Sequence, residues 1–417
     1  MKPPTLSIII PTHNRAAMLR QHLAALAIQS WPLETIEVIV VADSCVDQTE
    51  AAVTSLATET LFSLRLISHQ ARSAAASRQA GAEAARGEVL IFLDDDIAVD
   101  HDFIRAHMEA QQPNRVVLGY SRPVLPARPS RWQVDAYRWW EDSFRAFARP
   151  GHRFTYRDFF SGNASLPSEL FWRVGGFDLS FSGRLEDYEL GMRLIKAGAN
   201  LHFAPLAIGD HHDQTDLPQW LRRLRQEGIA DVQIAQRHPE LRSYIFDLRY
   251  RPSLVVRLLR LSAFFAPKRG ASLEQMILQA LAICERFGLR YRWKQLLGAL
   301  RDYNYYRGVA GELGSRDNYK RWLGQAPSRQ RMASEVPMID LNNLPAGHEL
   351  AELLAQATAK GVTVMVGETE VFALPPEPGA EPLQIEHLRL ALREATRHAF
   401  IPGLTLSMAR LAYGDRS

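Results

Sequence analysis

Short apolar runs alternate with amphipathic segments over the first hundred residues, and few folds accommodate this alternation. The apolar runs predict buried strands at residues 6–11, 36–43, 64–68 and 89–93. The amphipathic segments predict helices at residues 16–28, 48–56 and 73–85. Parallel strands need a long crossover connection, usually a helix, so the pattern predicts βαβ units and an α/β fold with a mostly parallel sheet.

Polar residues follow three of these strands at the point where each strand ends, namely Thr12–Asn14, Asp43 and Asp94–Asp96. In open α/β sheets, ligands bind beyond the carboxyl ends of the strands. One polar strand end alone is more simply a solvated loop, but three coincident ones favour a binding site. The first strand is followed by neither GxGxxG nor GxxxxGK[ST], which disfavours a dinucleotide-binding fold or a P-loop.

The aspartate triplet ends the fourth predicted strand, where like charges repel one another and resist desolvation. Because a strand projects alternate side chains to one face, Asp94 and Asp96 are expected to point the same way. Mg²⁺ is held by one or two carboxylates together with substrate phosphates, and a bound cation would remove the repulsion. Helix capping is the alternative, but Asp100 is better placed to cap the next helix. Asp94 and Asp96 are therefore predicted metal ligands, and Asp95 has no distinct role.

The segment PTHNR, residues 11–15, joins the first strand to the first helix. Backbone amides at a helix N-terminus suit an anionic phosphate, so this turn is a candidate phosphate-binding site. Arg72 and Arg78 lie on the segment that leads to the fourth strand. A guanidinium there could fork onto phosphate, and a surface role is an equally consistent interpretation of either arginine.

The segment 183–198 predicts a helix whose first turn carries Glu186 and Asp187. Carboxylates there complement the helix dipole, but the glycines and polar residues before the helix indicate a loop that lines a cleft. Farther along, GDHHDQTD offers His211 and His212. Adjacent histidines on a strand face opposite ways, so one is expected to be a metal ligand and the other structural.

Composition excludes several classes of protein. The chain has 417 residues, of which 47% are hydrophobic and 23% charged, as in ordinary globular proteins. A net charge of +3 is too mild to imply nucleic-acid binding. Two cysteines cannot form a disulfide framework and fit a reducing compartment. The first apolar run predicts a strand rather than a signal peptide, and no stretch reaches the roughly 18 apolar residues of a membrane span, so a cytoplasmic location is expected.

The composition changes twice after residue 130. Aromatic residues between 130 and 160 have the spacing of one helical face, which indicates core packing or, alternatively, an aromatic wall for a sugar or lipid acceptor. The chain is helical and basic from about 242 to 323, and a small α/β unit begins near Val336. The expected domains are residues 1–240, 241–330 and 331–417.

Taken together, PTHNR, the strand-end Asp43, FLDDD, SGNAS, GGFD and LEDYELGMRLIKAG resemble the family-2 glycosyltransferases of the GT-A fold. The motif order matches throughout residues 5–235. The resemblance implies a GT-A fold and transfer of a sugar from a nucleotide-diphosphate donor with inversion at the anomeric carbon. The second strand ends VVADSC rather than with a double-aspartate-glycine, which leaves base recognition open, and the chain after about 240 matches no family element, which leaves the acceptor open.

The resemblance also implies roles for individual residues. Thr12 and Asp43 would hold the base and ribose, Asp96 would be the more direct metal ligand of the DXD pair, and Asp187 would be the catalytic base. The predicted donor-binding residues are Pro11, Thr12, Asn14, Arg15, Asp43, Arg72, Arg78, Asp94, Asp95, Gly162 and Asn163. The predicted metal ligands are Asp94, Asp96, His211 and His212, and the predicted catalytic residues are Glu186 and Asp187.

The chain is therefore predicted to be a glycosyltransferase that uses Mg²⁺ or Mn²⁺ and a nucleotide-diphosphate sugar, with a UDP-sugar as the leading donor. The predicted acceptor is a carbohydrate or a lipid-linked sugar of bacterial polysaccharide or glycolipid synthesis. A catalytically silent nucleotide-sugar-binding scaffold and a nucleotidyltransferase are the alternatives. The basic helical residues 249–261 and 286–307 are predicted either to lie on anionic lipid at the cytoplasmic face of the membrane or to close over the acceptor site.

Overall fold

The computed structural model describes residues 4–71, 73–181, 184–246, 262–265, 267–325, 336–343, 347–357 and 361–398. The predicted donor residue Arg72 and the basic segment 249–261 lie outside these ranges. Among the helices within them, none is both long and apolar enough to cross a membrane.

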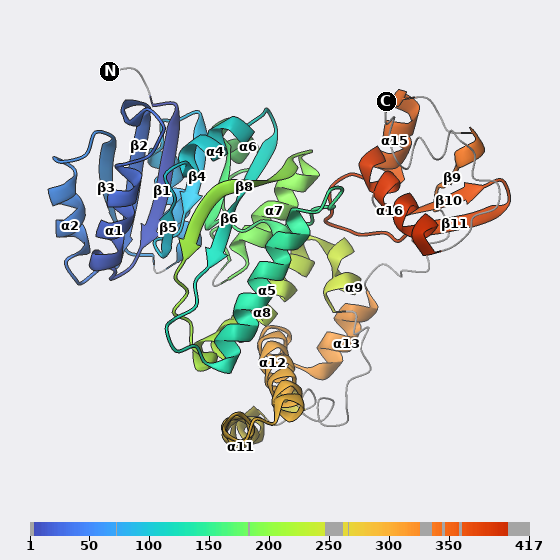
Figure 1. Ribbon diagram of the computed structural model, residues 1–417. Coiled ribbons are helices and arrows are strands. Elements are labelled where there is room, and N and C mark those ends of the chain that lie inside the picture. The colour runs from blue at the N-terminus through green and yellow to red at the C-terminus, as the bar shows by residue number, and fades with distance from the viewer. Residues whose placement is uncertain are drawn as a thin grey trace.

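An eight-stranded sheet forms the centre of the N-terminal region (Figure 1). Its strands are β1 (Leu6–Thr12), β2 (Ile36–Asp43), β3 (Ser63–His69), β4 (Val89–Leu93), β5 (Ile97–Val99), β6 (Arg115–Pro123), β7 (Asn163–Pro167) and β8 (Asn200–His211). The order is β3-β2-β1-β4-β7-β6-β8-β5, and the first four strands are parallel. Strand β7 is antiparallel to β4 and β6, and β5 is antiparallel to β8. The predicted α/β class with a mostly parallel sheet flanked by helices is confirmed.

Helices cover both faces of the sheet. On one face lie α1 (Ala16–Leu26), α2 (Thr49–Leu56) and α4 (Phe103–Ala110), and on the other α3 (Ala74–Ala84), α5 (Arg131–Phe147), α6 (Ser168–Arg173) and α7 (Glu186–Lys196). Strand β1 shows why both are needed, because Ile8 and Ile10 pack into one core and Ile9 into the other. A strand buried on both faces reads as a continuous apolar run, which is the signal that predicted it.

The helix predicted to begin at Asp100 begins instead at Phe103, with Asp102 at the N-cap position. The short strand β5 occupies Ile97–Val99, and the Asp100 side chain lies 3.7 Å from the Arg122 guanidinium. The capping role predicted for Asp100 is therefore wrong. Because β5 pairs with β8, the chain must run on as a strand before α4 can start.

A helical extension follows the sheet and comprises α8 (Leu217–Arg237), α9 (Arg242–Ile245), α11 (Pro267–Arg286), α12 (Arg290–Leu313) and α13 (Arg316–Gly324). Helix α8 contributes to the core beneath the sheet and also to the core of the extension. It crosses α12 closely, since Gly228 and Gly308 each leave room for a backbone carbonyl of the other helix.

Replacing Gly308 with Ala is expected to destabilise the extension by about 1–3 kcal/mol, because the added Cβ would overlap the carbonyl oxygen of Arg225. The matched control is Gly311→Ala in the same helix, where nothing lies within 4 Å of the added Cβ. That change should stabilise α12 by up to about 1 kcal/mol through helix propensity. Urea denaturation followed by tryptophan fluorescence measures both, and equal midpoints for the two variants would contradict the close crossing.

The C-terminal unit comprises β9 (Met338–Asp340), α15 (Gly347–Ala357), β10 (Val362–Val366), β11 (Thr369–Leu374) and α16 (Ile385–His398), with a core of its own. Figure 1 shows it beside the sheet region, joined by the segment that precedes α16. There the Tyr156 and Glu381 amides donate to the carbonyls of Gly379 and Phe154, both at 2.8 Å. Because three regions have separate cores, we propose the three predicted domains, with α8 shared between the first two.

Candidate active site

A cavity of about 1670 Å³ opens beyond the carboxyl ends of β1, β2 and β4. The predicted residues that line it are Pro11, Thr12, Asn14, Arg15, Asp43, Arg78, Asp94, Asp95, Asp96, Gly162, Glu186, Asp187 and His211. Asn163 and His212 do not line it. Ligand pockets usually measure about 300–1,000 Å³, so this cavity has room for two substrates side by side.

The aspartate triplet forms a turn rather than a continuation of β4. The Ile97 amide donates to the Asp94 carbonyl at 3.2 Å, so strand alternation does not place Asp94 and Asp96 on one face, and that premise was wrong. Asp95 is buried and accepts hydrogen bonds of 2.7 Å from Thr12 Oγ1 and the Arg15 guanidinium. Burial raises the pKa of Asp95 to about 6. Asp95 thus anchors the turn to β1 and α1, a role that the sequence left unassigned.

Arg78 is buried in the wall of the cavity and bridges two carboxylates. Its guanidinium lies 2.6 Å from Asp94 Oδ1 and 2.8 Å from Glu186 Oε1. Burial by itself would raise the pKa of Asp94, but the adjacent guanidinium lowers it below its usual value. The surface alternative for Arg78 is wrong, because the side chain is buried. The phosphate contact stays a prediction, since two nitrogens of Arg78 already contact protein carboxylates and its Nε has no hydrogen-bond partner among the described residues.

Asp96 and His211 meet where β5 pairs with β8. Ile97 lies opposite His211 in that ladder, and Asp96 Oδ1 is 3.7 Å from His211 Nε2. His212 is exposed and uses its backbone amide to hold the Asp96 carbonyl at 2.9 Å. Of the two adjacent histidines, His211 therefore faces the cavity and His212 has the structural position.

A divalent cation fits part of the predicted ligand set. In the described ranges, no three His, Cys, Asp or Glu side chains are grouped to hold a metal ion. Asp96 and His211 nevertheless face each other across a gap that an ion could bridge, with oxygen and nitrogen donors that Mn²⁺ accepts. Asp94 contacts Arg78 through Oδ1 only, so its Oδ2 remains a possible ligand atom and its predicted role as a ligand stays a prediction.

Asp187 lies in the first turn of α7 and its Oδ1 accepts a hydrogen bond of 2.9 Å from the Tyr188 amide. Burial, and then the Glu186 charge, raise the pKa of Asp187 to about 7. These effects outweigh the helix dipole, which favours the ionised form. Leu185, the residue directly before α7, has a left-handed backbone conformation with φ 66°. This conformation is unfavourable for a bulky residue and is found mainly where function requires it.

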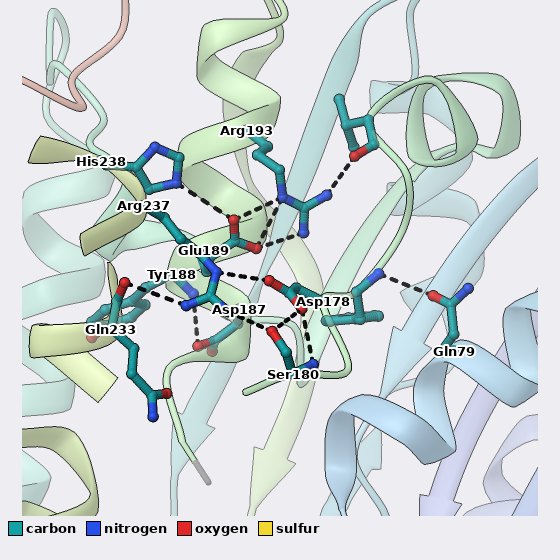
Figure 2. Close-up of polar contacts among 12 residues, drawn as sticks. Gln79, Asp178, Ser180, Asp187, Tyr188, Glu189, Arg193, Gln233, Arg237 and His238 are labelled. Atoms are coloured by element: carbon teal, nitrogen blue, oxygen red, sulfur yellow. Dashed lines mark hydrogen bonds and ion pairs between the residues drawn. The ribbon is translucent and has the colours of Figure 1, made fainter. Parts of the chain in front are cut away.

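Helix α7 is held by polar contacts of Glu189, a residue that does not line the cavity (Figure 2). Glu189 accepts hydrogen bonds from Arg193 at 2.6–2.9 Å and lies 3.4 Å from His238 of the segment after α8. The loop before α7 is tied to α8 by an ion pair of 2.9 Å between Asp178 and Arg237. Charge-assisted contacts of this kind are strong and directional, so they fix the position of Asp187 over the cavity.

The opposite wall of the cavity positions the predicted donor-binding residues. The Asp43 carboxylate accepts from the Ser73 amide at 2.9 Å and from Ser77 Oγ at 3.1 Å, so the start of α3 fixes its orientation. Gly162 must be glycine, since an added Cβ would lie 2.5 Å from Asp94 Oδ2. Asn163 is buried behind the cavity, where it contacts His107 at 2.9 Å, so its predicted place beside the donor sugar is wrong.

The remaining wall contains residues that the sequence did not single out. Asp231 of α8 is buried and accepts 2.6 Å from Tyr305 of α12, and Arg157 lies 3.9 Å from its Oδ1. That oxygen has no hydrogen-bond partner among the described residues. Trp139 and Trp140 of α5 also line the cavity, and the Trp140 ring lies 5.8 Å from that of His211. Phe144 and Phe147 are core residues, so core packing is confirmed for them, and the aromatic wall for an acceptor stays a prediction. No local pattern predicts contacts between residues 70 to 150 positions apart.

The chain matches the family described as Glycosyl transferase family 2 over residues 7–175. It is 29% identical over 273 residues to a validoxylamine A glucosyltransferase of Streptomyces hygroscopicus subsp. jinggangensis, covering 58% of this chain and 63% of the relative. It is 23% identical over 240 residues to the probable glycosyltransferase YdaM of Bacillus subtilis, covering 53% of each. The chain thus spans between half and two thirds of these relatives.

Among solved structures, the fold is similar to the mannosyltransferase PcManGT from Pyrobaculum calidifontis, solved with GDP-Man and Mn²⁺, at a TM-score of 0.49 and 19% identity over 73% of this chain and 88% of that one. Asp187 and His211 lie beyond the residues that match the family, although the cavity brings them to the motifs within it. Residues 7–175 belong to glycosyl transferase family 2, and the resemblance predicted from the motifs is confirmed.

Proposed function

We propose that this protein transfers a sugar from a nucleotide-diphosphate donor to an acceptor hydroxyl by a single inverting displacement. The observation that carries the proposal is Asp187, a carboxylate with a pKa of about 7 at the wall of a cavity large enough for two substrates. A general base works best with a pKa near the working pH, and Asp187 meets this condition. It would take the proton of the attacking hydroxyl.

The donor is proposed to bind between Thr12, Asp43 and the aspartate turn, with a UDP-sugar as the leading candidate. A divalent cation would be held by Asp96 and His211 and would supply charge neutralisation for the leaving diphosphate. Arg15, about four-tenths exposed and already beside Asp95 and Asp96, would add positive charge at the same point. Asp94 and Arg78 would hold the neighbouring wall in position.

The acceptor is proposed to bind at the end lined by Trp139, Trp140, Asp231 and Tyr305. Aromatic faces suit the apolar faces of sugar rings, and the unsatisfied Asp231 Oδ1 suits a hydroxyl donor. A carbohydrate or lipid-linked acceptor of bacterial polysaccharide or glycolipid synthesis would fit this wall, at the cytoplasmic face of the membrane. The glucosyltransferase relatives make glucose a reasonable first sugar to test.

The test is nucleotide release from UDP-glucose, UDP-GlcNAc and GDP-mannose, with and without Mn²⁺ and after chelation. We expect metal-dependent release from one donor and a loss of about tenfold or more in donor affinity for Asp96→Ala, because losing a metal ligand, or a residue that orients one, costs at least this much. Asp102→Ala, an exposed aspartate outside the cavity, is the control. Donor binding that is unchanged by chelation and by Asp96→Ala would contradict the metal site. Binding without any turnover would favour a silent scaffold, and release of pyrophosphate from a nucleoside triphosphate would favour a nucleotidyltransferase.

A further inference from the structure

Helix α11 carries an exposed apolar strip in addition to its buried face. Ile277 and Leu281 pack into the extension, whereas Met276, Ile283 and Phe287 are 63%, 56% and 69% exposed. With Leu273 at 37%, the exposed residues follow the spacing i, i+3, i+10 and i+14. At 100° per residue these positions fall within a narrow sector next to the buried face, so they form a continuous strip. Single exposed apolar residues are ordinary, but a continuous strip marks an interaction surface.

The turn from α11 to α12 extends this strip and adds positive charge. Leu289 and Tyr291 are 49% and 73% exposed, and Arg286, Arg290 and Arg292 are exposed beside them. Between residues 275 and 295 the sequence holds four basic residues and a single acidic one, Glu285. Glu285 accepts a hydrogen bond from the Arg131 amide of α5 at 3.2 Å. The strip is therefore apolar at its centre and cationic at its end.

We propose that this surface, formed by Leu273, Met276, Ile283, Phe287, Leu289 and Tyr291 with Arg286, Arg290 and Arg292, docks on an anionic lipid bilayer. An apolar helix face flanked by arginines is the pattern of helices that lie in the membrane interface. Each arginine near an anionic surface strengthens binding by about 1 kcal/mol, roughly a fivefold gain. A second copy of the chain would have to bring a compensating acidic surface to this end of the strip. The charge therefore favours lipid.

The position of this surface gives it a consequence for the cavity. Helix α12 begins at Arg290, and its residues Leu297, Gly298 and Arg301 line the cavity, on the same helix as Tyr305 of the proposed acceptor end. At 1.5 Å per residue, the docking turn lies roughly 10 Å along α12 from that lining. Figure 1 shows α11 beyond α12, away from the sheet. Docking would bring the acceptor end close to the lipid headgroups, where a lipid-linked sugar is presented. This consequence rests on the proposed function, but the docking surface itself does not.

The experiment is vesicle flotation of the full chain with phosphatidylcholine vesicles, with and without phosphatidylglycerol. We expect binding that requires phosphatidylglycerol and weakens with salt. Ile283→Gln/Phe287→Gln should lower partitioning roughly tenfold or more, since two large apolar side chains leave the bilayer. Arg290→Gln/Arg292→Gln should lower it roughly 25-fold, and only with anionic vesicles. The matched control is Leu61→Gln, which removes an apolar side chain that is 80% exposed in the loop before β3.

Nucleotide release in solution is measured on the same preparations and should be unchanged in all of these variants, because none of the substituted residues lines the cavity. Loss of lipid binding with intact turnover supports the docking surface, whereas intact binding without turnover would count only against the proposed function. Equal partitioning of the surface variants and Leu61→Gln would overturn the inference. So would a dimer in gel filtration that disappears in Ile283→Gln/Phe287→Gln, which would assign the strip to a second copy.

Discussion

Replacing Asp187 with Asn is expected to lower the rate of sugar transfer by about 10²–10⁴ while leaving donor binding unchanged. The amide keeps the shape of the side chain and cannot accept a proton. Calorimetric titration of the donor measures binding, and nucleotide release with acceptor measures turnover. Near wild-type transfer in Asp187→Asn would show that the base is another group.

The same substitution is expected to make the protein more stable above neutral pH. The pKa of Asp187 is raised from 3.8 in the unfolded chain to about 7, so its contribution to stability is present at low pH and is lost as the pH rises through about 7. Asn has no charge to desolvate, and its advantage should reach about 1–3 kcal/mol at pH 8. Thermal denaturation of both proteins at pH 5 and pH 8 measures this difference in stability. A variant less stable than wild type at pH 8 would contradict the raised pKa of Asp187.

The wild-type rate should follow the ionisation of the same group. Transfer is expected to fall about tenfold for each pH unit below 7, because only the ionised carboxylate can act as a base, and to level off above about pH 7. Glu227→Gln in the same cavity is the matched control and should leave this pH profile in place.

Replacing Arg78 with Met is expected to cost about 3–5 kcal/mol of stability. The change leaves Asp94 and Glu186 without the guanidinium that each contacts within 2.8 Å, and an uncompensated buried charge is strongly unfavourable. Equilibrium denaturation in urea measures the loss. The deficit should shrink as the pH is lowered, because loss of Arg78 removes the charge that holds the pKa of Asp94 down, and protonation of Asp94 then removes an uncompensated charge.

Two controls isolate this effect. Arg15→Met removes an arginine that also contacts two aspartates but is about four-tenths exposed, so solvent screening should limit its cost to about 1 kcal/mol. Arg78→Met/Glu186→Gln removes one of the two stranded charges and should recover part of the loss. If Arg78→Met were no less stable than Arg15→Met, Arg78 would not be the central ion-pair partner of this wall.

Local patterns were sufficient for β1 to β4 and for the helices between them, whereas β5 to β8 were not predicted. Strand β2 runs from Ile36 to Asp43 as predicted, because a continuous apolar run bounded by polar residues has few other interpretations. Helix α7 lies within the segment 183–198 that was predicted to be helical, and Gly198 at φ 80° follows its C-cap residue Ala197. Beyond the strand ends, prediction was weaker. The strand alternation assumed for Asp94–Asp96 failed because the chain turns directly after β4 ends. Beyond the end of a strand, strand pairing no longer determines which way a side chain points.

By itself the sequence determined the order of the first four strands and the helices between them, the family motifs, and most of the side chains that gather beyond the carboxyl ends of the parallel strands. These depend on periodicity and on short-range chemistry, which a single chain displays directly. Tertiary structure alone decided that His211 rather than His212 faces Asp96, that Arg78 binds carboxylates, and that residues of α8 and α12 line the cavity. It also decided the raised pKa of Asp187, because burial and the neighbouring charge depend on packing between segments far apart in the chain.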